Sequence, residues 1–302
     1  MSLWPALPAL EDDLLIDADA IYDDEAGPAD AQDERDELAA YRRARRRARA
    51  RRLGTGAAGL VVLAAIWQAI AMALGDPVFL PSVTQTAHAF VHYFNRPYPA
   101  QGEPLWYDAV SSLRRILIGF ALGTIAGVML GAGMSVSRVV RHLVDPVIEV
   151  LRPLPPLAFI PLFIIWLGIG EMPKEVLIIT GVTPIMAVTT VAALDEVADD
   201  LRLCARTLGA SARYALLHVQ IRAALPGILT GMRISMAGAW TSIVAAELIA
   251  ATTGLGYLIM QAGDYLNTAL VFSGILTIAL LGLGLDACLR GLLLIADPSR
   301  RQ

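Results

Sequence analysis

The sequence predicts an all-α, polytopic membrane protein with six transmembrane helices. Its 302 residues are 56% hydrophobic and only 17% charged, with a mean hydropathy of +0.58, which is too apolar for a soluble domain of this size. Apolar segments of about 20 residues, enough to cross a hydrocarbon core of about 30 Å, recur along the chain. We expect the spans at about residues 53–74, 112–134, 150–170, 175–194, 223–251 and 265–290.

The first 52 residues differ in composition from the rest of the chain. Thirteen of the 28 acidic residues lie in residues 1–40, and eight arginines lie in residues 42–52. The acidic part is typical of a solvated cytosolic tail, with a regulatory or docking arm as the alternative. The arginines directly precede an uncharged segment, so we interpret them as a juxtamembrane block that meets anionic lipid head groups, and not as a nucleic-acid-binding site. We therefore predict a tail at 1–52, a transmembrane domain at 53–295 and a second tail at 296–302.

The basic residues also predict the orientation of the chain. With both termini in the cytoplasm, the inside segments carry sixteen basic residues and the outside segments only two, Arg96 and Lys174. This orientation places residues 195–222 in the cytoplasm. Arg114 and Arg115 fit less well, because they fall at the outer start of the second span. We expect them to extend to the outer interface, with attraction of an anionic substrate as the alternative.

The loop of residues 75–107 is rich in proline and aromatic residues and predicts a short helix near Thr84–Phe94. Such a loop could brace a dimer or receive a soluble partner. His88 and His92 have the i, i+4 spacing of a metal site, but no third ligand is apparent, so we expect an exposed or interfacial helix face. Cys204 and Cys288 form no metal spacing or disulfide framework, and we expect small core residues.

The segment of residues 145–170 predicts a helix that is broken repeatedly, because it carries prolines at 146, 153, 155, 156 and 161. A broken helix at membrane depth requires protein or an aqueous path to cover it. Glu149 and Arg152 can pair on one helix face, either at the membrane boundary or along a pore. Arg233 and Glu247 are about 21 Å apart along one helix, so each should face the bundle, a cavity or a partner subunit.

The longest polar interruption after residue 110 keeps an apolar stripe. Leu201, Ala205, Leu208 and Ala212 fall on one face of a helix, and Gly209 interrupts the pattern where the backbone has to turn or approach something closely. A loop that only links two spans has no need of an amphipathic helix. We therefore predict that residues 195–222 dock on another protein.

The sequence lacks the motifs of several enzyme classes. Its single lysine, Lys174, lies in EMPKEVL, which is no phosphate-binding glycine loop, so the chain is not expected to hydrolyse ATP. There is no HExxH, no CxxC and no cluster of intramembrane carboxylates of the kind that proton relays use. We predict a non-enzyme that binds no cofactor or metal and moves something across the membrane.

The docking stretch resembles the cytoplasmic loop of ABC importer permeases. Leu203-Cys204-Ala205 stands at the EAA positions of that loop motif, Gly209 at its glycine, and Val219–Arg222 at its last segment. Leu203 replaces the glutamate and Arg222 the proline, so we expect apolar packing around Gly209 to dominate over an ion pair. The stretches RPLPPLAFIPL, RTLGAS and AELIAATTGLGYLI resemble the taurine, sulfonate, nitrate and bicarbonate branch of that family, and most of all its taurine permeases.

The resemblance implies a type I ABC importer permease fold in a bacterial cytoplasmic (inner) membrane. Two copies of the chain would form the pore, and two ATPase subunits would bind ATP and Mg²⁺. A soluble extracytoplasmic binding protein would deliver a small organic anion such as taurine or another aliphatic sulfonate. Nitrate, bicarbonate or an aromatic acid is the alternative cargo, and a stand-alone secondary transporter or channel is the alternative of another class.

The resemblance also implies two sets of functional residues. The ATPase-coupling set is Leu201, Leu203, Cys204, Ala205, Arg206, Leu208, Gly209, Ala210, Ser211 and Ala212. The translocation path set is Glu149, Arg152, Pro155, Pro156, Arg233, Trp240 and Glu247.

Overall fold

The computed structural model describes residues 28–100 and 102–296. The expectations for the acidic stretch before residue 28 and for the tail at 297–302 lie outside the described residues. Two compact units divide the chain, one ending at Ile66 and the other beginning at Trp67. The functional features described below all belong to the second unit.

Helices make up nearly all of the described chain, which confirms the all-α prediction. They are α1 (Pro28–Leu74), α2 (Val83–Phe94), α3 (Leu105–Val136), α4 (Arg138–Leu151), the 3₁₀ turn η1 (Pro156–Phe159), α5 (Ile160–Leu167), α6 (Met172–Asp195), α7 (Asp199–Thr207), α8 (Ala212–Tyr214), the π-helical turn η2 (Ala215–Gln220), α9 (Ile221–Ala250), α10 (Leu255–Asp264) and α11 (Thr268–Ala296). Two short strands, β1 (Pro97–Tyr98) and β2 (Glu103–Pro104), pair antiparallel.

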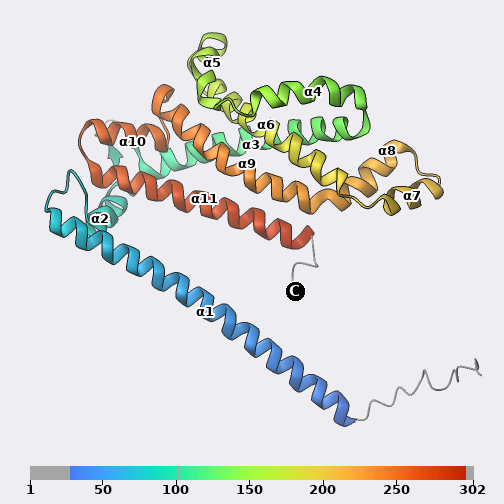
Figure 1. The fold of residues 1–302 in the computed structure, drawn as a ribbon. Helices are drawn as coiled ribbons and strands as arrows, with labels where there is room; N and C mark the ends of the chain where they lie inside the picture. The colour runs from blue at the N-terminus through green and yellow to red at the C-terminus, as the bar shows by residue number, and fades with distance from the viewer. Residues whose placement is uncertain (1–27, 101, 297–302) are drawn as a thin grey trace, which may run out of the picture. The chain divides into compact units, whose positions relative to one another are not determined.

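The long helices α3, α6, α9 and α11 form the bundle of the second unit. α6 packs between α3 and α9, and α11 packs along α9. At one end these helices meet α2 and α10, and at the other end the chain forms α7 and α8 (Figure 1). Ser82 caps α2 through a capping box with Gln85, which explains why the predicted helix near Thr84–Phe94 begins where it does.

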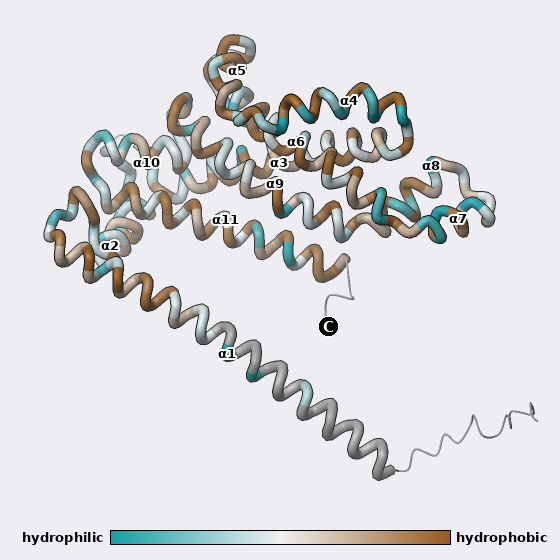
Figure 2. Tube along the Cα trace, viewed as in Figure 1, coloured by the Kyte–Doolittle hydropathy of each residue, from teal (hydrophilic) through white to brown (hydrophobic). Residues whose placement is uncertain are grey.

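The described helices support a membrane-spanning chain. Four of them are long and apolar enough to cross a membrane, or up to five if the bent pair of α4 with η1 and α5 counts as one span. α9 is 30 residues long but is not among those four, and it carries Arg233 and Glu247. Figure 2 shows the apolar residues along α11 and the hydrophilic residues that gather at α7. The count of six spans stays a prediction.

Glycine allows α3 and α6 to approach closely. A Cβ atom added at Gly127 would lie 2.4 Å from Cβ of Met186, and one at Gly123 would lie 2.9 Å from Cβ of Val182. These glycines belong to a series with a spacing of four residues: Gly119, Gly123, Gly127 and Gly131. The buried side chains of Ile178, Val182 and Met186 fill the space and join the main hydrophobic core.

The proline-rich segment is broken once and not repeatedly. α4 ends at Leu151, and the pair of α4 with η1 and α5 is bent by 93° at the break that follows (Figure 1). Pro146 lies inside α4 without ending it, and Pro161 lies in the first turn of α5, where its missing N–H is not needed. The prolines between these helices, at 153, 155 and 156, therefore account for the bend.

Candidate functional site

The predicted docking stretch forms two short helices joined by a tight turn. α7 ends in a Schellman motif, in which the N–H of Ala210 donates to the Ala205 carbonyl and the N–H of Gly209 donates to the Arg206 carbonyl, both at 3.0 Å. Gly209 has φ of +80°, a left-handed conformation that glycine adopts without strain. A side chain at Gly209 would meet no atom within 4 Å. The turn itself therefore requires this glycine, and close packing within the chain does not.

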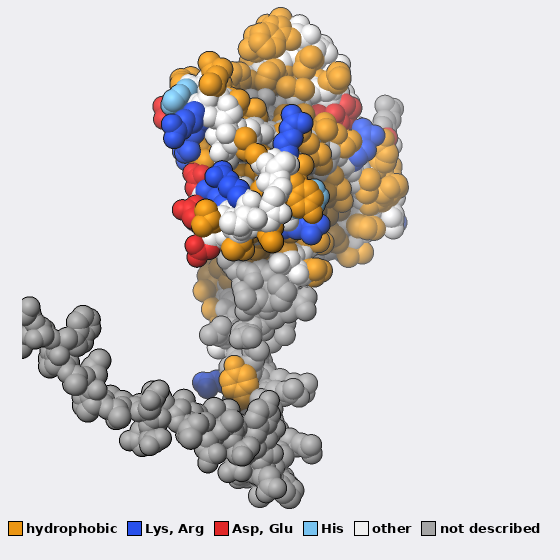
Figure 3. Space-filling view, turned by 90° about the vertical axis from the view of Figure 1, so that its right-hand side faces the viewer, with side chains coloured by type: hydrophobic (Ala, Val, Ile, Leu, Met, Phe, Trp, Pro, Cys, Tyr) orange, Lys and Arg blue, Asp and Glu red, His pale blue; other side chains and the backbone are white. Residues whose placement is uncertain are grey.

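The apolar stripe predicted for this stretch is split by the turn. Ala205 is only 7% exposed in the chain, whereas Leu208 is 88% exposed and Leu203 is 64% exposed. α7 packs against η2, which accounts for the burial of Ala205. We call residues 199–214 the coupling segment. Figure 3 looks onto the side of the molecule that carries it, where hydrophobic side chains lie among arginines and acidic residues.

Of the two cysteines, only Cys204 belongs to the predicted coupling set. Cys204 and Cys288 are both exposed, so the prediction that they are core residues is wrong. Ser211 caps α8 by accepting a hydrogen bond from the Tyr214 N–H. The coupling set thus contains exposed side chains, one buried alanine and the residues that shape the turn.

A buried ion-pair network lies near the start of α10. Arg115 is only 2% exposed and uses all its donors: Nη1 donates to Oε1 of Glu247 and to the Thr253 carbonyl, and Nη2 and Nε donate to Glu171 and to the Thr253 hydroxyl. The expectation that Arg115 extends to the outer interface is therefore wrong. Arg114 next to it is 63% exposed at its side chain. The partners of Arg115 lie far away in sequence, in or beside α6 and α9.

The same network holds the turn between α9 and α10. Oε2 of Glu247 accepts from the Gly256 N–H at 2.9 Å, and the Ser112 hydroxyl donates to Glu247 at 2.8 Å. Asp108 accepts from the Gly254 N–H at 2.7 Å. We call Asp108, Ser112, Arg115, Glu171, Lys174 and Glu247 the ion-pair network. The two carboxylates of Glu171 and Glu247 meet the two cations of Arg115 and Lys174, so these four charges are compensated inside the chain.

Glu171 is the member of this network that lies outside the helices. Burial by itself would raise the pKa of Glu171, but hydrogen bonds and positive charge from Arg115 and Lys174 lower it from its ordinary value of 4.5 to about 2. Nζ of Lys174 donates to Oε1 of Glu171 at 3.0 Å. Glu171 is therefore ionised at neutral pH and ties the start of α6 to α3.

The candidates for a translocation path do not come together. Arg152, Pro155 and Pro156 line a cavity of about 540 Å³ at the break after α4, opposite the middle of α6 and α9. Glu149 is exposed on α4, and no ion pair joins it to Arg152 within the described residues. The interpretation of these two residues as an ion pair is therefore not supported by the structure.

The candidates on α9 face away from this cavity. Nε of Arg233 donates to Asp286 on α11 at 2.8 Å, and Asp286 also pairs with Arg290. Nε1 of Trp240 would lie 3.5 Å from a Cβ atom added at Gly282 of α11. Glu247 belongs to the ion-pair network. Arg233 and Glu247 were expected to face the bundle, a cavity or a partner subunit, and the structure shows both paired inside the bundle; sequence reasoning missed the partner Asp286.

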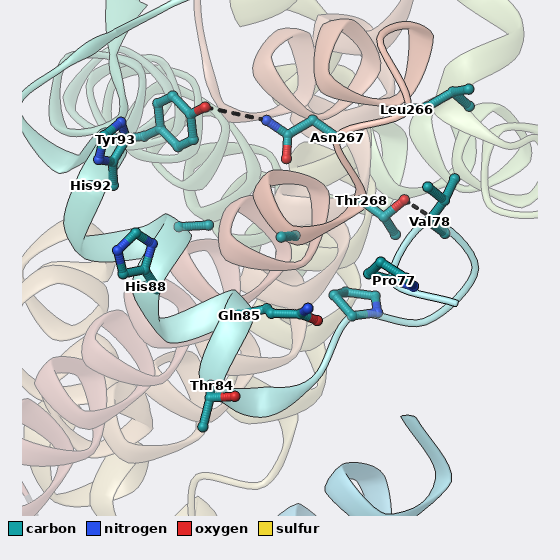
Figure 4. Close-up of a pocket in the computed structure, with 13 residues that line it drawn as sticks. Pro77, Val78, Thr84, Gln85, His88, His92, Tyr93, Leu266, Asn267 and Thr268 are labelled. Atoms are coloured by element: carbon teal, nitrogen blue, oxygen red, sulfur yellow. Dashed lines mark hydrogen bonds between the residues drawn. The ribbon is translucent and has the colours of Figure 1, made fainter. Parts of the chain in front are cut away.

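A second pocket, of about 560 Å³, lies at the end that carries α2 and α10. Figure 4 shows His88 and His92 on successive turns of α2, with Asn267 and Thr268 across the pocket. The two imidazole rings are stacked with their centroids 5.9 Å apart. Among the described residues, no group of three or more His, Cys, Asp or Glu side chains is arranged to hold a metal ion. Polar and apolar side chains line this pocket together.

Comparisons with known proteins agree on one family. The family model described as "Binding-protein-dependent transport system inner membrane component" matches residues 121–302. The chain is 38% identical over 234 residues to the taurine transport system permease protein TauC of Escherichia coli (strain K12), covering 77% of this chain and 85% of the relative. It is 31% identical over 235 residues to the nitrate import permease protein NrtB of Synechococcus elongatus, covering 75% and 84%.

A solved structure has the same fold. The structure described as inward facing conformations of the MetNI methionine ABC transporter superposes with a TM-score of 0.51 at 20% identity, and the match covers 64% of this chain and 94% of the other. At this identity the match shows the fold alone. The type I ABC importer permease fold expected from the sequence is thereby confirmed.

Proposed function

Because the chain belongs to the family of binding-protein-dependent transport system inner membrane components, we propose that it is the permease subunit of an ATP-driven ABC importer for a small organic anion, such as taurine or another aliphatic sulfonate. The identity to the taurine permease over most of both chains carries this proposal. Nitrate is the alternative cargo, supported by the nitrate relative. The alternative of a stand-alone secondary transporter or channel has no support from these relatives.

The partners in this proposal follow from the family and from the shape of the coupling segment. Two copies of the chain form the pore in a bacterial inner membrane, with both termini in the cytoplasm. Two ATPase subunits bind ATP and Mg²⁺ and contact the coupling segment, where Leu203 and Leu208 offer apolar surface. A soluble binding protein delivers the anion at the end that carries α2 and α10, where polar and apolar side chains line the pocket beside His88.

Coupling would then work by shifting the helix bundle between two conformations. Closure of the ATPase pair moves the coupling segment, and the helices that follow it transmit the motion to the pore. The chain itself supplies no ATP chemistry in this mechanism. Its contribution is a rigid connection from the turn after α7 into α9. The backbone is helical without interruption from Ala212 through η2 to Ala250.

Reconstitution with the ATPase and the binding protein tests the proposal, with uptake of taurine, alkanesulfonates and nitrate as the readout. We expect ATP-dependent uptake by the wild type and none by Gly209→Asp, which places a side chain and a charge at the coupling turn. Gly75→Asp is the matched control, because Gly75 also has a positive φ (+68°) and open surroundings but lies outside the coupling segment. Normal ATPase coupling in Gly209→Asp would show that the coupling segment is not the ATPase docking site.

A further inference from the structure

The cavity at the break after α4 has the size of a small-molecule site. Its volume of about 540 Å³ falls within the range of about 300–1,000 Å³ that is usual for ligand pockets. Gly181 keeps it open, since a Cβ atom there would lie 3.2 Å from Cγ of Pro156 and 3.3 Å from Oγ of Ser242. Three segments far apart in sequence therefore leave a shared space beside the bend.

The charge that faces this cavity is positive. Arg152 lines it, and none of the described residues that line it is acidic. The guanidinium of Arg152 has no ion pair within the described part of the chain, in contrast to Arg115, Arg141, Arg202 and Arg233. An anion that enters the cavity would thus meet a cation that is not already neutralised.

One hydroxyl in the cavity wall has its donor available. Thr180 donates to the Val176 carbonyl at 2.8 Å, and Thr241 donates to the Ala237 carbonyl at 3.1 Å, so both hydroxyl protons are engaged in their own helices. Ser242 is 3% exposed, and its hydroxyl makes no hydrogen bond in the described structure. Because Ser242 lines the cavity, its hydroxyl is free to donate to an oxyanion bound there.

The rest of the wall is apolar. Leu157, Ile185 and Ile234 line the cavity together with the prolines of the bend. We propose that this cavity is a binding site for the transported anion inside the permease: Arg152 and Ser242 hold an oxyanion head group, and the apolar side chains contact a short hydrocarbon tail. The inference rests on the proposed function and extends it to a defined place in the chain.

The composition of the site limits its ligands and its strength. With no acidic side chain among its described lining residues, the cavity offers no partner to an ammonium group, so propane-1-sulfonate should bind at least as well as taurine. A single cation and a single free hydroxyl give a weak site. A transport path requires such weakness, because the ligand has to leave the site again.

Equilibrium binding of radiolabelled propane-1-sulfonate tests the site, using the chain with its ATPase in lipid nanodiscs and no binding protein. Charged hydrogen bonds contribute about 1.5–3 kcal/mol, so Arg152→Gln should weaken binding by about tenfold or more. Arg152→Lys keeps the charge and should stay within about threefold of the wild type. Ser242→Ala should weaken binding by roughly two- to tenfold. Arg138→Gln, an exposed arginine of α4 that does not line the cavity, is the matched control.

The outcomes separate the site from the proposed function. Absence of binding to the wild type, unchanged binding in both Arg152→Gln and Ser242→Ala, or an equal loss in Arg138→Gln overturns the inference. If Arg152→Gln does not fold, Arg152→Lys and Ser242→Ala decide the question. ATP-dependent uptake by the wild type is measured in parallel with the binding protein present. If the wild type shows ATP-dependent uptake but the variants bind propane-1-sulfonate as well as the wild type does, the binding site is rejected and the importer function stands. If the wild type binds propane-1-sulfonate but shows no ATP-dependent uptake, the importer function is rejected and the binding site stands.

Discussion

The ion-pair network and the coupling segment lie toward opposite ends of the bundle and are held in different ways. In the network, the buried guanidinium of Arg115 meets acceptors on three other segments, and the charges are compensated within the chain. In the coupling segment, Leu203 and Leu208 are mostly exposed and a single glycine turn sets the geometry. The first region is complete by itself, whereas the second presents apolar surface that requires another protein to cover it.

The largest expected effect on stability comes from breaking the ion-pair network. Arg115→Met leaves Glu247 buried without its cation, and breaking a buried pair in this way costs about 3–5 kcal/mol. We expect the variant to lose its monodisperse peak in size-exclusion chromatography or to unfold at a much lower temperature. Arg114→Met is the matched control: the Arg114 side chain is 63% exposed and its ion pair with Glu171, at 3.7 Å, is open to solvent, so its loss should change stability by less than about 0.5 kcal/mol. Equal stability of the two variants would contradict the role given to Arg115.

A smaller loss of stability is expected when the pH is lowered. The folded pKa of Glu171 is about 2 and its ordinary value is 4.5, so its ion pairs stabilise the chain fully above pH 4.5 and are lost as the pH falls toward 2. Glu171→Gln should lower stability at pH 7 by about 1 kcal/mol, a modest value because the Glu171 side chain is 40% exposed and solvent screens it.

Thermal unfolding of both proteins from pH 7 to pH 3 measures this difference. We expect the stabilities of the wild type and Glu171→Gln to converge as the pH falls below 4.5. A constant difference over the whole range would show that the carboxylate charge of Glu171 is not what stabilises the network.

Local chemistry made parts of the fold predictable. Proline removes a backbone donor, so the sequence of residues 145–170 indicated a break, and the structure has one where the prolines at 153, 155 and 156 cluster. The capping residues of α2 and the glycine at 209 likewise act on the few residues around them. Such signals depend on neighbours in sequence, which a single chain displays directly.

The partners of buried charges could not be predicted in the same way. Arg115 pairs with Glu171 and Glu247, which are 56 and 132 residues away, and nothing near Arg115 in sequence points to either. The available signal was the cost of a charge within a span, which demands a compensating charge somewhere in the bundle. That reasoning placed Glu247 and Arg233 correctly toward the bundle but did not identify Asp286, because a partner is selected by helix packing and not by spacing.

The smallest effect on stability should come from the coupling segment, where the expected change is in partner binding. Leu208 is 88% exposed, so Leu208→Ser should change the unfolding temperature very little, whereas loss of an apolar contact should weaken ATPase binding by roughly tenfold. Leu283→Ser, at a 67% exposed leucine of α11, is the matched control and should leave ATPase affinity unchanged. If both variants lose affinity equally, or if Leu208→Ser unfolds as readily as Arg115→Met, the two regions do not differ in the way described. If only Leu208→Ser loses affinity while its fold persists, the exposed leucine acts through a partner, because nothing within the chain depends on it.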